Sequence, residues 1–368
     1  MKRWIGILGI AAVAVLLTGF YFYLSATRHA PVLTLASWAG SYGHAQESAL
    51  LQPFAERSGA DARIADYDGG TSELARQVAT KTYAWDVIDL ELPDAVEACR
   101  AGLLEPIHAS QLPPSGDGTP AARDFVPGAL GPCWVGSVVY SQIIAYDPHR
   151  FAGEQPETPA DFFDLKKFPG PRALRKSAKF NFELALLADG VAPGAVYDTL
   201  STPEGVQRAL AKLDTLKGAL VWWSEDDPPA KMLADGRAAM ASILNGDVFD
   251  TETSGHMLGT IWDGQLYELD VFGIPKGDPK RALAMDFLRF ATGAEALAGV
   301  ADWVPYGPAR RSAWPLVGEN PELKIAMTPY EPTAPGRFAG AFAIDDGWWK
   351  LHGEDVDLLW QAWLNKGP

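Results

Sequence analysis

Histidine, cysteine and catalytic signatures are scarce in this sequence. Its 368 residues include six histidines and two cysteines. The GxSxG, GxGxxG, HExxH and P-loop patterns are all absent. No histidine lies within one helical turn of another, and the cysteines form no CxxC pair, so the residues give no sign of a zinc site. We therefore expect a protein that is not an enzyme, with no catalytic residue, no cofactor and no metal.

Positive charge is also in short supply. Lysine and arginine number 31 against 46 acidic residues, which gives a formal net charge of −15. Such a balance argues against nucleic acid and against anionic membrane surfaces as partners. It is compatible with a small cationic ligand.

Charge is missing altogether from residues 4–27, which follow Lys2 and Arg3. A basic start followed by an apolar run is typical of an export signal. The run is close to the roughly 20 residues that a membrane span requires. Residues 1–30 are therefore predicted to be a signal peptide or an N-terminal membrane anchor, and both readings stay open. Either one places the remaining chain in the periplasm.

The two cysteines, Cys99 and Cys133, would then lie in an oxidising compartment. An even number of cysteines in an exported protein favours a disulfide bond. We expect a Cys99–Cys133 disulfide, and the alternative is a pair of buried free thiols.

The remaining chain alternates between short apolar runs and amphipathic segments, without internal repeats or low-complexity tracts. This alternation is typical of βαβ units and a mainly parallel sheet. The expected strands lie at 32–36, 61–70, 85–91, 135–147, 218–226, 238–244 and 267–277, and the expected helices include 45–58, 71–81, 91–102, 202–216, 284–293 and 354–364.

Two of the expected strands, 135–147 and 267–277, are long enough to cross from one lobe to another. The predicted fold is accordingly α/β, with two lobes joined by two crossover strands and a ligand cleft between them. Lobe 1 is predicted to comprise 31–143 and 270–314, and lobe 2 to comprise 144–269 and 315–368. Ligands of open α/β sheets bind at the carboxyl ends of the strands, so the cleft should lie there.

Aromatic and acidic residues cluster at these expected strand ends. Aromatic faces and carboxylates are the groups that hold an ammonium ion well. The predicted ligand-binding residues are Trp38 and Tyr42 in SWAGSYG, Glu91 after the third strand, Trp223 of the Trp pair, Asn245 and Asp247 in the NGD turn, Asp270 in the second crossover, and Tyr306.

Asp270 is the most informative of these residues. It lies between Leu269 and Val271 in an apolar strand, where an unpaired carboxylate is costly. Either it pairs with a basic side chain, or it binds a cationic ligand. Structural roles are open for the rest of the set as well, since Trp38 could cover the core and Asp247 could cap a helix.

The motifs LTLASWAGSYGHA, DYDGGTSELARQV, WDVIDLE, GLLEPI, VVYSQIIAYD, LADGRAAMASILNGDVF, YELDVFGIPKG and WVPYGPA together resemble the polyamine-type (spermidine/putrescine) substrate-binding proteins of ABC transporters. These belong to the bacterial extracellular solute-binding proteins. The resemblance implies a type II periplasmic-binding-protein fold, a monomer, and delivery of ligand to ABC permease subunits in the inner membrane. It also implies ligand contacts by Trp38, Tyr42, Asp247, Asp270 and Tyr306.

The sequence departs from the polyamine-type pattern in two places. Leu244 stands where an aromatic residue is expected, and Phe180 and Asn181 stand where an acid is expected. A smaller amine or an amino-acid-like solute is therefore a second hypothesis for the ligand, and its carboxylate would need Arg175 or Arg310. Two further hypotheses for the function are an exported hydrolase on the same scaffold and a membrane-anchored sensor domain.

Overall fold

The computed structural model describes residues 30–366 of the chain. The predicted signal peptide or anchor therefore lies almost wholly outside the described residues. Within residues 30–366, no helix combines the length and the apolar character needed to cross a membrane.

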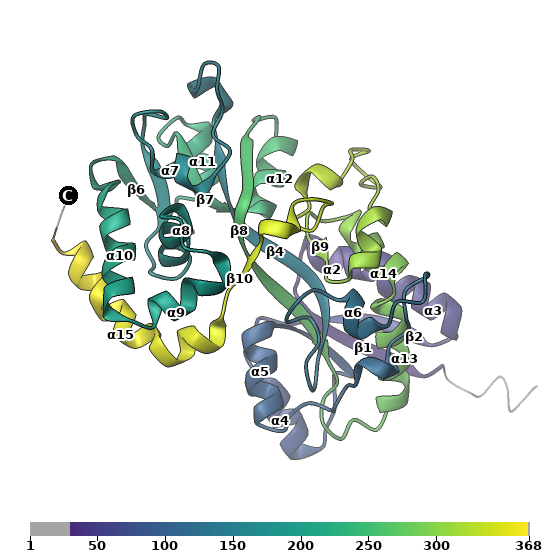
Figure 1. Ribbon diagram of the computed structural model, residues 1–368. Helices are drawn as coiled ribbons and strands as arrows, with labels where there is room; N and C mark the ends of the chain where they lie inside the picture. The colour runs from purple at the N-terminus through teal and green to yellow at the C-terminus, as the bar shows by residue number, and fades with distance from the viewer. Residues whose placement is uncertain (1–29, 367–368) are drawn as a thin grey trace, which may run out of the picture.

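One hydrogen-bonded sheet runs through two lobes in the strand order β2-β1-β3-β8-β4-β7-β5-β6 (Figure 1). The α/β class agrees with the prediction, but the sheet is mixed and not mainly parallel, because β8 pairs antiparallel with β3 and β4, and β4 pairs antiparallel with β7. The strands are β1 Val32–Ser37, β2 Asp61–Asp66, β3 Val87–Glu91, β4 Val135–Tyr146, β5 Arg172–Arg175, β6 Leu220–Trp223, β7 Met240–Leu244, β8 Gly259–Gly273, β9 Gly307–Pro308 and β10 Phe342–Ala343.

Strands β4 and β8 are the two predicted crossovers, and they pair antiparallel along most of their length. The expected limits of β4 agree with the structure, whereas β8 begins earlier than predicted. The reason is Gly264, whose φ of +66° accompanies a register shift in the β4–β8 ladder. A glycine after an aspartate predicts a turn, but here it accommodates a β-bulge inside a continuous strand.

Helices cover both lobes, with α2, α3, α4, α5, α13 and α14 around the first and α7 to α11 and α15 around the second (Figure 1). Their limits are α2 Ser41–Gln46, α3 Gln52–Ser58, α4 Ser72–Thr80, α5 Leu92–Arg100, α6 Ala121–Asp124, α7 Pro159–Phe163, α8 Asn181–Ala188, α9 Val196–Leu200, α10 Pro203–Asp214, α11 Pro229–Ala234, α12 Asn245–Thr253, α13 Arg281–Ala291, α14 Ala294–Ala301 and α15 Asp346–Leu364.

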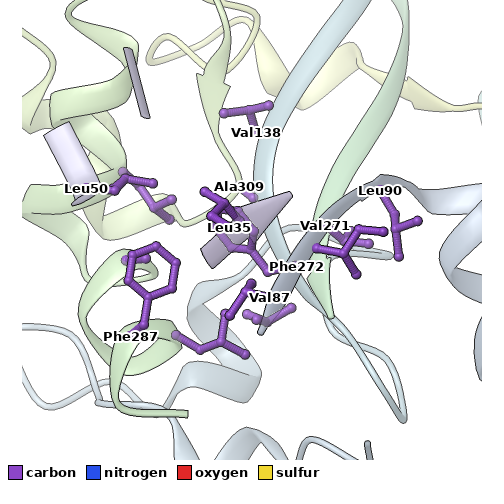
Figure 2. Close-up of a cluster of buried hydrophobic side chains, with 14 of the residues drawn as sticks. Leu35, Leu50, Val87, Leu90, Val138, Val271, Phe272, Phe287 and Ala309 are labelled. Carbon is purple, nitrogen blue, oxygen red and sulfur yellow. The ribbon is translucent and has the colours of Figure 1, made fainter. Parts of the chain in front are cut away.

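Lobe 1 is built on the parallel strands β1, β2 and β3, of which β1 and β3 are buried on both faces whereas the edge strand β2 is partly exposed. Val87, Ile88 and Leu90 of β3 are all fully buried, as expected for a parallel strand covered by helices on each side. Figure 2 shows part of this core, where Leu35, Phe272 and Phe287 pack together. The rigid sheet thereby holds the carboxyl ends of β1 and β3 in place.

Lobe 2 has two cores, one on each face of its sheet. Successive residues of a strand point to opposite faces, and the lobe follows this alternation. Ile144 and Met240 join the core under α7 to α10 and α15, whereas Ile143 and Ala241 join the smaller core under α11. The residue limits assigned to the two lobes from the sequence stay a prediction.

Two predicted helices begin earlier in the structure than in the sequence prediction. The helical segment expected at 45–58 starts at Ser41 and continues through a π-helical turn at Glu47–Leu51. Gly40, with a φ of +80°, allows this early start, and a Cβ on Gly43 would lie 2.5 Å from the Trp38 carbonyl oxygen. The C-terminal helix starts at Asp346, where the Asp345 side chain caps it.

The predicted disulfide is present between Cys99 at the end of α5 and Cys133 just before β4, with the Cα atoms 5.7 Å apart. The alternative of two free thiols is therefore wrong. The bond ties a helix of lobe 1 to the start of a crossover strand.

Candidate ligand-binding site

Strand ends from both lobes supply the predicted site residues. Trp38 follows β1 and Glu91 ends β3 in lobe 1, while Trp223 ends β6 in lobe 2. Asp270 lies on crossover β8, directly opposite Glu91 in the antiparallel β3–β8 pair. The site is thus built around the crossover strands, where the carboxyl ends of parallel strands place functional groups.

Asp270 is buried, with only 6% of the residue exposed. Its Oδ1 has no hydrogen-bond partner among the described residues. Burial, together with the carboxylates of Asp89 and Glu91, raises the pKa of Asp270 well above its ordinary value. Of the two roles expected for this carboxylate, pairing with a basic side chain of residues 30–366 is therefore not the one observed.

Asp89 is a second buried carboxylate whose charge acts on Asp270, but unlike Asp270 Oδ1 its Oδ2 has hydrogen-bond partners. Its Oδ2 accepts hydrogen bonds from the Tyr42 hydroxyl at 2.8 Å, from Ser37 and from Gln46. Burial raises the pKa of Asp89 to about 7, while these hydrogen bonds lower it. The sequence analysis did not identify Asp89 as a site residue, because its neighbours in β3 suggest only a buried strand.

Three tyrosine rings line the region next to Asp270. Tyr306 meets the edge of Tyr42 at a centroid distance of 5.5 Å and lies 6.3 Å from Tyr140. Burial, with the charge of Asp270, raises the pKa of Tyr306 to about 12. Tyr140, on crossover β4 opposite Glu268, escapes sequence reasoning because a tyrosine in a long apolar strand resembles a core residue.

Trp38 is partly buried and packs edge-to-face on Tyr67 at 5.0 Å. Its indole Nε1 is buried and has no hydrogen-bond partner in the part of the chain that the structure describes. A buried N–H without an acceptor is uncommon in proteins. Trp38 thus combines an aromatic face with a free donor.

Asn245 and Asp247, the two candidate ligand residues of the NGD turn, have different surroundings. Asn245 is buried, and its amide is engaged with the Ser141 N–H at 2.8 Å and with the Pro305 carbonyl. It connects the start of α12 to crossover β4 and to the loop before Tyr306. Asp247 lies in the first turn of α12, and burial raises its pKa to about 6. Ligand contact by either residue stays a prediction, and the contacts favour a positioning role for Asn245.

The two rings of the tryptophan pair pack on different cores of lobe 2. Trp222 packs on Trp360 and Trp363 in the larger core of lobe 2. Trp223 donates its indole N–H to the Ser242 carbonyl at 3.0 Å and leaves its ring beside Arg175, whose guanidinium carbon is 5.6 Å from the ring centroid.

The two arginines expected to suit a ligand carboxylate have different surroundings. Arg310 is buried and is fully engaged with Asp124 and with the carbonyls of Thr292 and Pro113. Arg175, at the end of β5, keeps 51% of its side chain exposed and reaches Glu225 at 3.8 Å. Of the two, only Arg175 has a guanidinium that a ligand could meet.

Several other polar groups lie near the site, and most of them already have protein partners. Glu91 is exposed as a whole residue, yet partial burial of its carboxyl and the nearby Glu268 raise its pKa. Asp94 accepts the Gly70 N–H at 2.8 Å, and Asn181 donates to the carbonyls of Arg175 and Ser177. Lys179 bridges Glu268 and Asp346, an arrangement that no pattern in the sequence predicts.

A cavity of about 610 Å³ opens between the lobes beside β8. Its walls include α5 of lobe 1, α9 and the start of α15 in lobe 2, and Glu268. Across the described residues, no group of three or more histidine, cysteine or acidic side chains is placed to hold a metal ion. Neither Arg175 nor any of the eight predicted ligand-binding residues lines this cavity, so it lies beside the candidate site and meets it at Glu268.

Comparison with known proteins gives a family match over most of the chain. Residues 49–325 match the model of the bacterial extracellular solute-binding protein family. The gamma-aminobutyric acid-binding protein of Pseudomonas aeruginosa (PAO1) is 35% identical over 347 residues, which cover 94% of this chain and 95% of that protein.

Solved structures agree on the fold. A GABA receptor structure matches with a TM-score of 0.69 and 29% identity, over 90% of this chain and 97% of the other. The PBP MotA from A. tumefaciens B6, in complex with glucopine, matches with a TM-score of 0.66 and 28% identity, over 90% and 99% of the two chains. The periplasmic-binding-protein-like fold predicted from the sequence is thereby confirmed.

Proposed function

The chain belongs to the family of bacterial extracellular solute-binding proteins, and we propose that it captures a small amine that also carries a carboxylate, such as 4-aminobutanoate. As a solute-binding protein of an ABC transporter, it would pass this ligand to the permease from the periplasm and act as a monomer. Polyamine binding, the first expectation from the sequence, is the second candidate.

Asp270 is the observation that carries the amine part of the proposal. A buried carboxyl without a partner is costly unless something compensates it. An ammonium ion beside Asp270 would favour the ionised form, and the rings of Tyr42, Tyr140 and Tyr306 would face the cation. Water-free contact between these groups would make the pairing strong.

Arg175 supports the carboxylate part. Its guanidinium is half exposed at the end of β5, and its only ion pair among the described residues is a long one to Glu225. An arginine fork matches the geometry of a carboxylate and can form two parallel hydrogen bonds with it. The relatives named above are consistent with this choice, since two of them are described by their binding of GABA.

A polyamine is favoured instead by the number of acids near the cleft. Asp247, Glu268 and Asp270 all have raised pKa values for which burial is the first cause. Several ammonium groups on one ligand could pair with several of these carboxyls. Leu244, which is 37% exposed where an aromatic wall is expected, counts against this second candidate.

The proposal is tested by calorimetric titration of the purified protein with 4-aminobutanoate, putrescine, spermidine, choline and a neutral sugar. We expect 4-aminobutanoate to bind, and the Asp270→Asn variant to bind it at least about 30-fold more weakly, because the buried ion pair is removed. The matched control is Asp355→Asn, which changes an exposed acid of α15 and should keep the wild-type affinity.

Binding of spermidine or putrescine in preference to 4-aminobutanoate would establish the second candidate. Binding of the neutral sugar alone, or an unchanged affinity in Asp270→Asn, would contradict the amine proposal while leaving the family assignment intact.

A further inference from the structure

The ammonium group of Lys179 lies between the carboxylates of Glu268 and Asp346. Its Nζ lies 2.7 Å from Glu268 Oε1 and 2.7 Å from Asp346 Oδ1. The three side chains are 16–29% exposed, so the bridge is sheltered from solvent. Although burial lowers it, the two carboxylates raise the pKa of Lys179.

The backbone next to Lys179 is unusual. Phe180 has a φ of +72°, which is rare for a residue with a side chain, and its ring lies 5.2 Å from the Lys179 ammonium. Such conformations persist only where the surroundings enforce them. The position of the lysine is therefore set by the chain around it, including the start of α8 at Asn181.

Glu268 and Asp270 are separated by one residue on β8, so their side chains leave the strand on the same face. Glu268 is paired with Lys179, whereas Asp270 Oδ1 has no partner in residues 30–366. The acids of this region thus divide into Glu268 and Asp346, which share the single ammonium of Lys179 and keep one uncompensated negative charge when ionised, and Asp270, whose Oδ1 has no partner in residues 30–366.

We propose that Lys179 occupies the position of a second ligand ammonium, so that the cleft selects solutes with a single ammonium group over diamines. The inference rests on the proposed function, because it needs an amine at Asp270. A diamine that placed its first ammonium at Asp270 would bring the second toward Lys179, where it meets a like charge and two carboxylates that are already bonded. A chain with one ammonium meets no such repulsion.

A purely structural role is the competing explanation for the bridge, since Lys179 could merely fasten the loop after β5 to β8 and to α15. Removal of a purely structural bridge would weaken binding of every ligand alike or lower the stability. Removal of a selectivity element would change the ranking of ligands. The ranking is therefore the deciding measurement.

The experiment compares three four-carbon probes by calorimetric titration: n-butylamine, 4-aminobutanoate and putrescine. For the wild-type protein we expect putrescine to bind at least about 10-fold more weakly than 4-aminobutanoate, because its second ammonium approaches the like charge of Lys179 and finds Glu268 and Asp346 already engaged. In Lys179→Met we expect putrescine to gain about 10-fold or more, while n-butylamine stays within about 2-fold of its wild-type affinity.

The matched control is Lys231→Met. Lys231 of α11 also pairs with a carboxylate, that of Asp235 at 2.6 Å, but its side chain is 60% exposed and it does not line the cavity between the lobes. We expect the ligand ranking of this variant to equal that of the wild type. Lys179→Gln, which keeps a hydrogen-bond donor, is the second variant if Lys179→Met fails to fold, and it should show the same gain for putrescine.

Wild-type protein that binds putrescine as tightly as 4-aminobutanoate would overturn the inference without any variant. Equal losses for all three probes in the Lys179 variants would overturn it too, in favour of a structural bridge. If the wild-type protein binds none of the amines, the proposed function fails and the inference fails with it. Binding of 4-aminobutanoate without any gain for putrescine in the variants would overturn the inference alone.

Discussion

At the scale of single residues, burial raises the pKa of the carboxyls in the site, and the protonation of these carboxyls affects the binding of a cation. Burial and the neighbouring acids raise the pKa of Asp270, and burial raises that of Asp89 to about 7. A raised pKa means that a carboxyl keeps its proton to a higher pH than a free aspartate does. An ammonium ligand pairs with the ionised form, so binding must release protons.

We therefore predict that amine binding tightens as the pH rises above the range in which a free aspartate titrates. The sign follows from the raised pKa, because the proton competes with the cation for Asp270 until the pH passes that pKa. Calorimetric titration at about pH 7 in two buffers with different ionisation enthalpies measures the protons released. Identical heats in the two buffers would show that the acids of the site are already ionised, and would contradict the prediction.

At the scale of secondary-structure elements, the disulfide joins α5 to the start of β4. It closes a loop with a sequence separation of 34 between Cys99 and Cys133. A crosslink of this span stabilises the folded state by roughly 3–4 kcal/mol through restriction of the unfolded chain. The bond supports the frame of lobe 1.

The double variant Cys99→Ala/Cys133→Ala is accordingly predicted to lose roughly 3–4 kcal/mol of unfolding free energy. Urea denaturation followed by circular dichroism measures the loss. Ligand affinity of the folded variant should be unchanged, because neither cysteine is among the residues proposed to bind the ligand. A wild-type midpoint in the variant would show that the bond adds nothing to stability.

At the scale of the whole molecule, the proposed ligand groups come from both lobes. Trp38, Tyr42 and Tyr306 belong to the packing of lobe 1, and Trp223 to that of lobe 2. Arg175 ends β5, which pairs with β6 and β7 in lobe 2. A ligand that contacts both sides favours the form in which the lobes are closer, and it can shift the population only by its differential affinity for that form.

We predict that saturating 4-aminobutanoate reduces the radius of gyration in solution X-ray scattering. In Arg175→Met the reduction should be lost and the affinity for 4-aminobutanoate should fall by about 10-fold or more, since a charge-assisted pair is removed. The affinity for n-butylamine, which has no carboxylate, should be unchanged. A variant that loses both ligands equally would contradict the assignment of Arg175 to the carboxylate.

The sequence by itself determined those features of the fold and of the candidate site that depend on local pattern. Alternating strand and helix periods predicted the α/β class, and the length of 135–147 predicted a crossover strand that the structure contains as β4. The carboxylate of Asp270 stood out between Leu269 and Val271 because polar groups in apolar strands are costly. The cysteine pair followed from the number of cysteines and the predicted compartment.

Only the tertiary structure decided which polar groups are already satisfied. Asn245 and Arg310 resemble ligand contacts in sequence, but backbone groups and acids distant along the chain engage them. Lys179 meets Asp346 across 167 positions of sequence, which no local pattern can predict. Hydrogen bonds and ion pairs depend on proximity in space, whereas periodicity reports only on neighbours along the chain, and the electrostatics of the cleft were therefore settled by the fold.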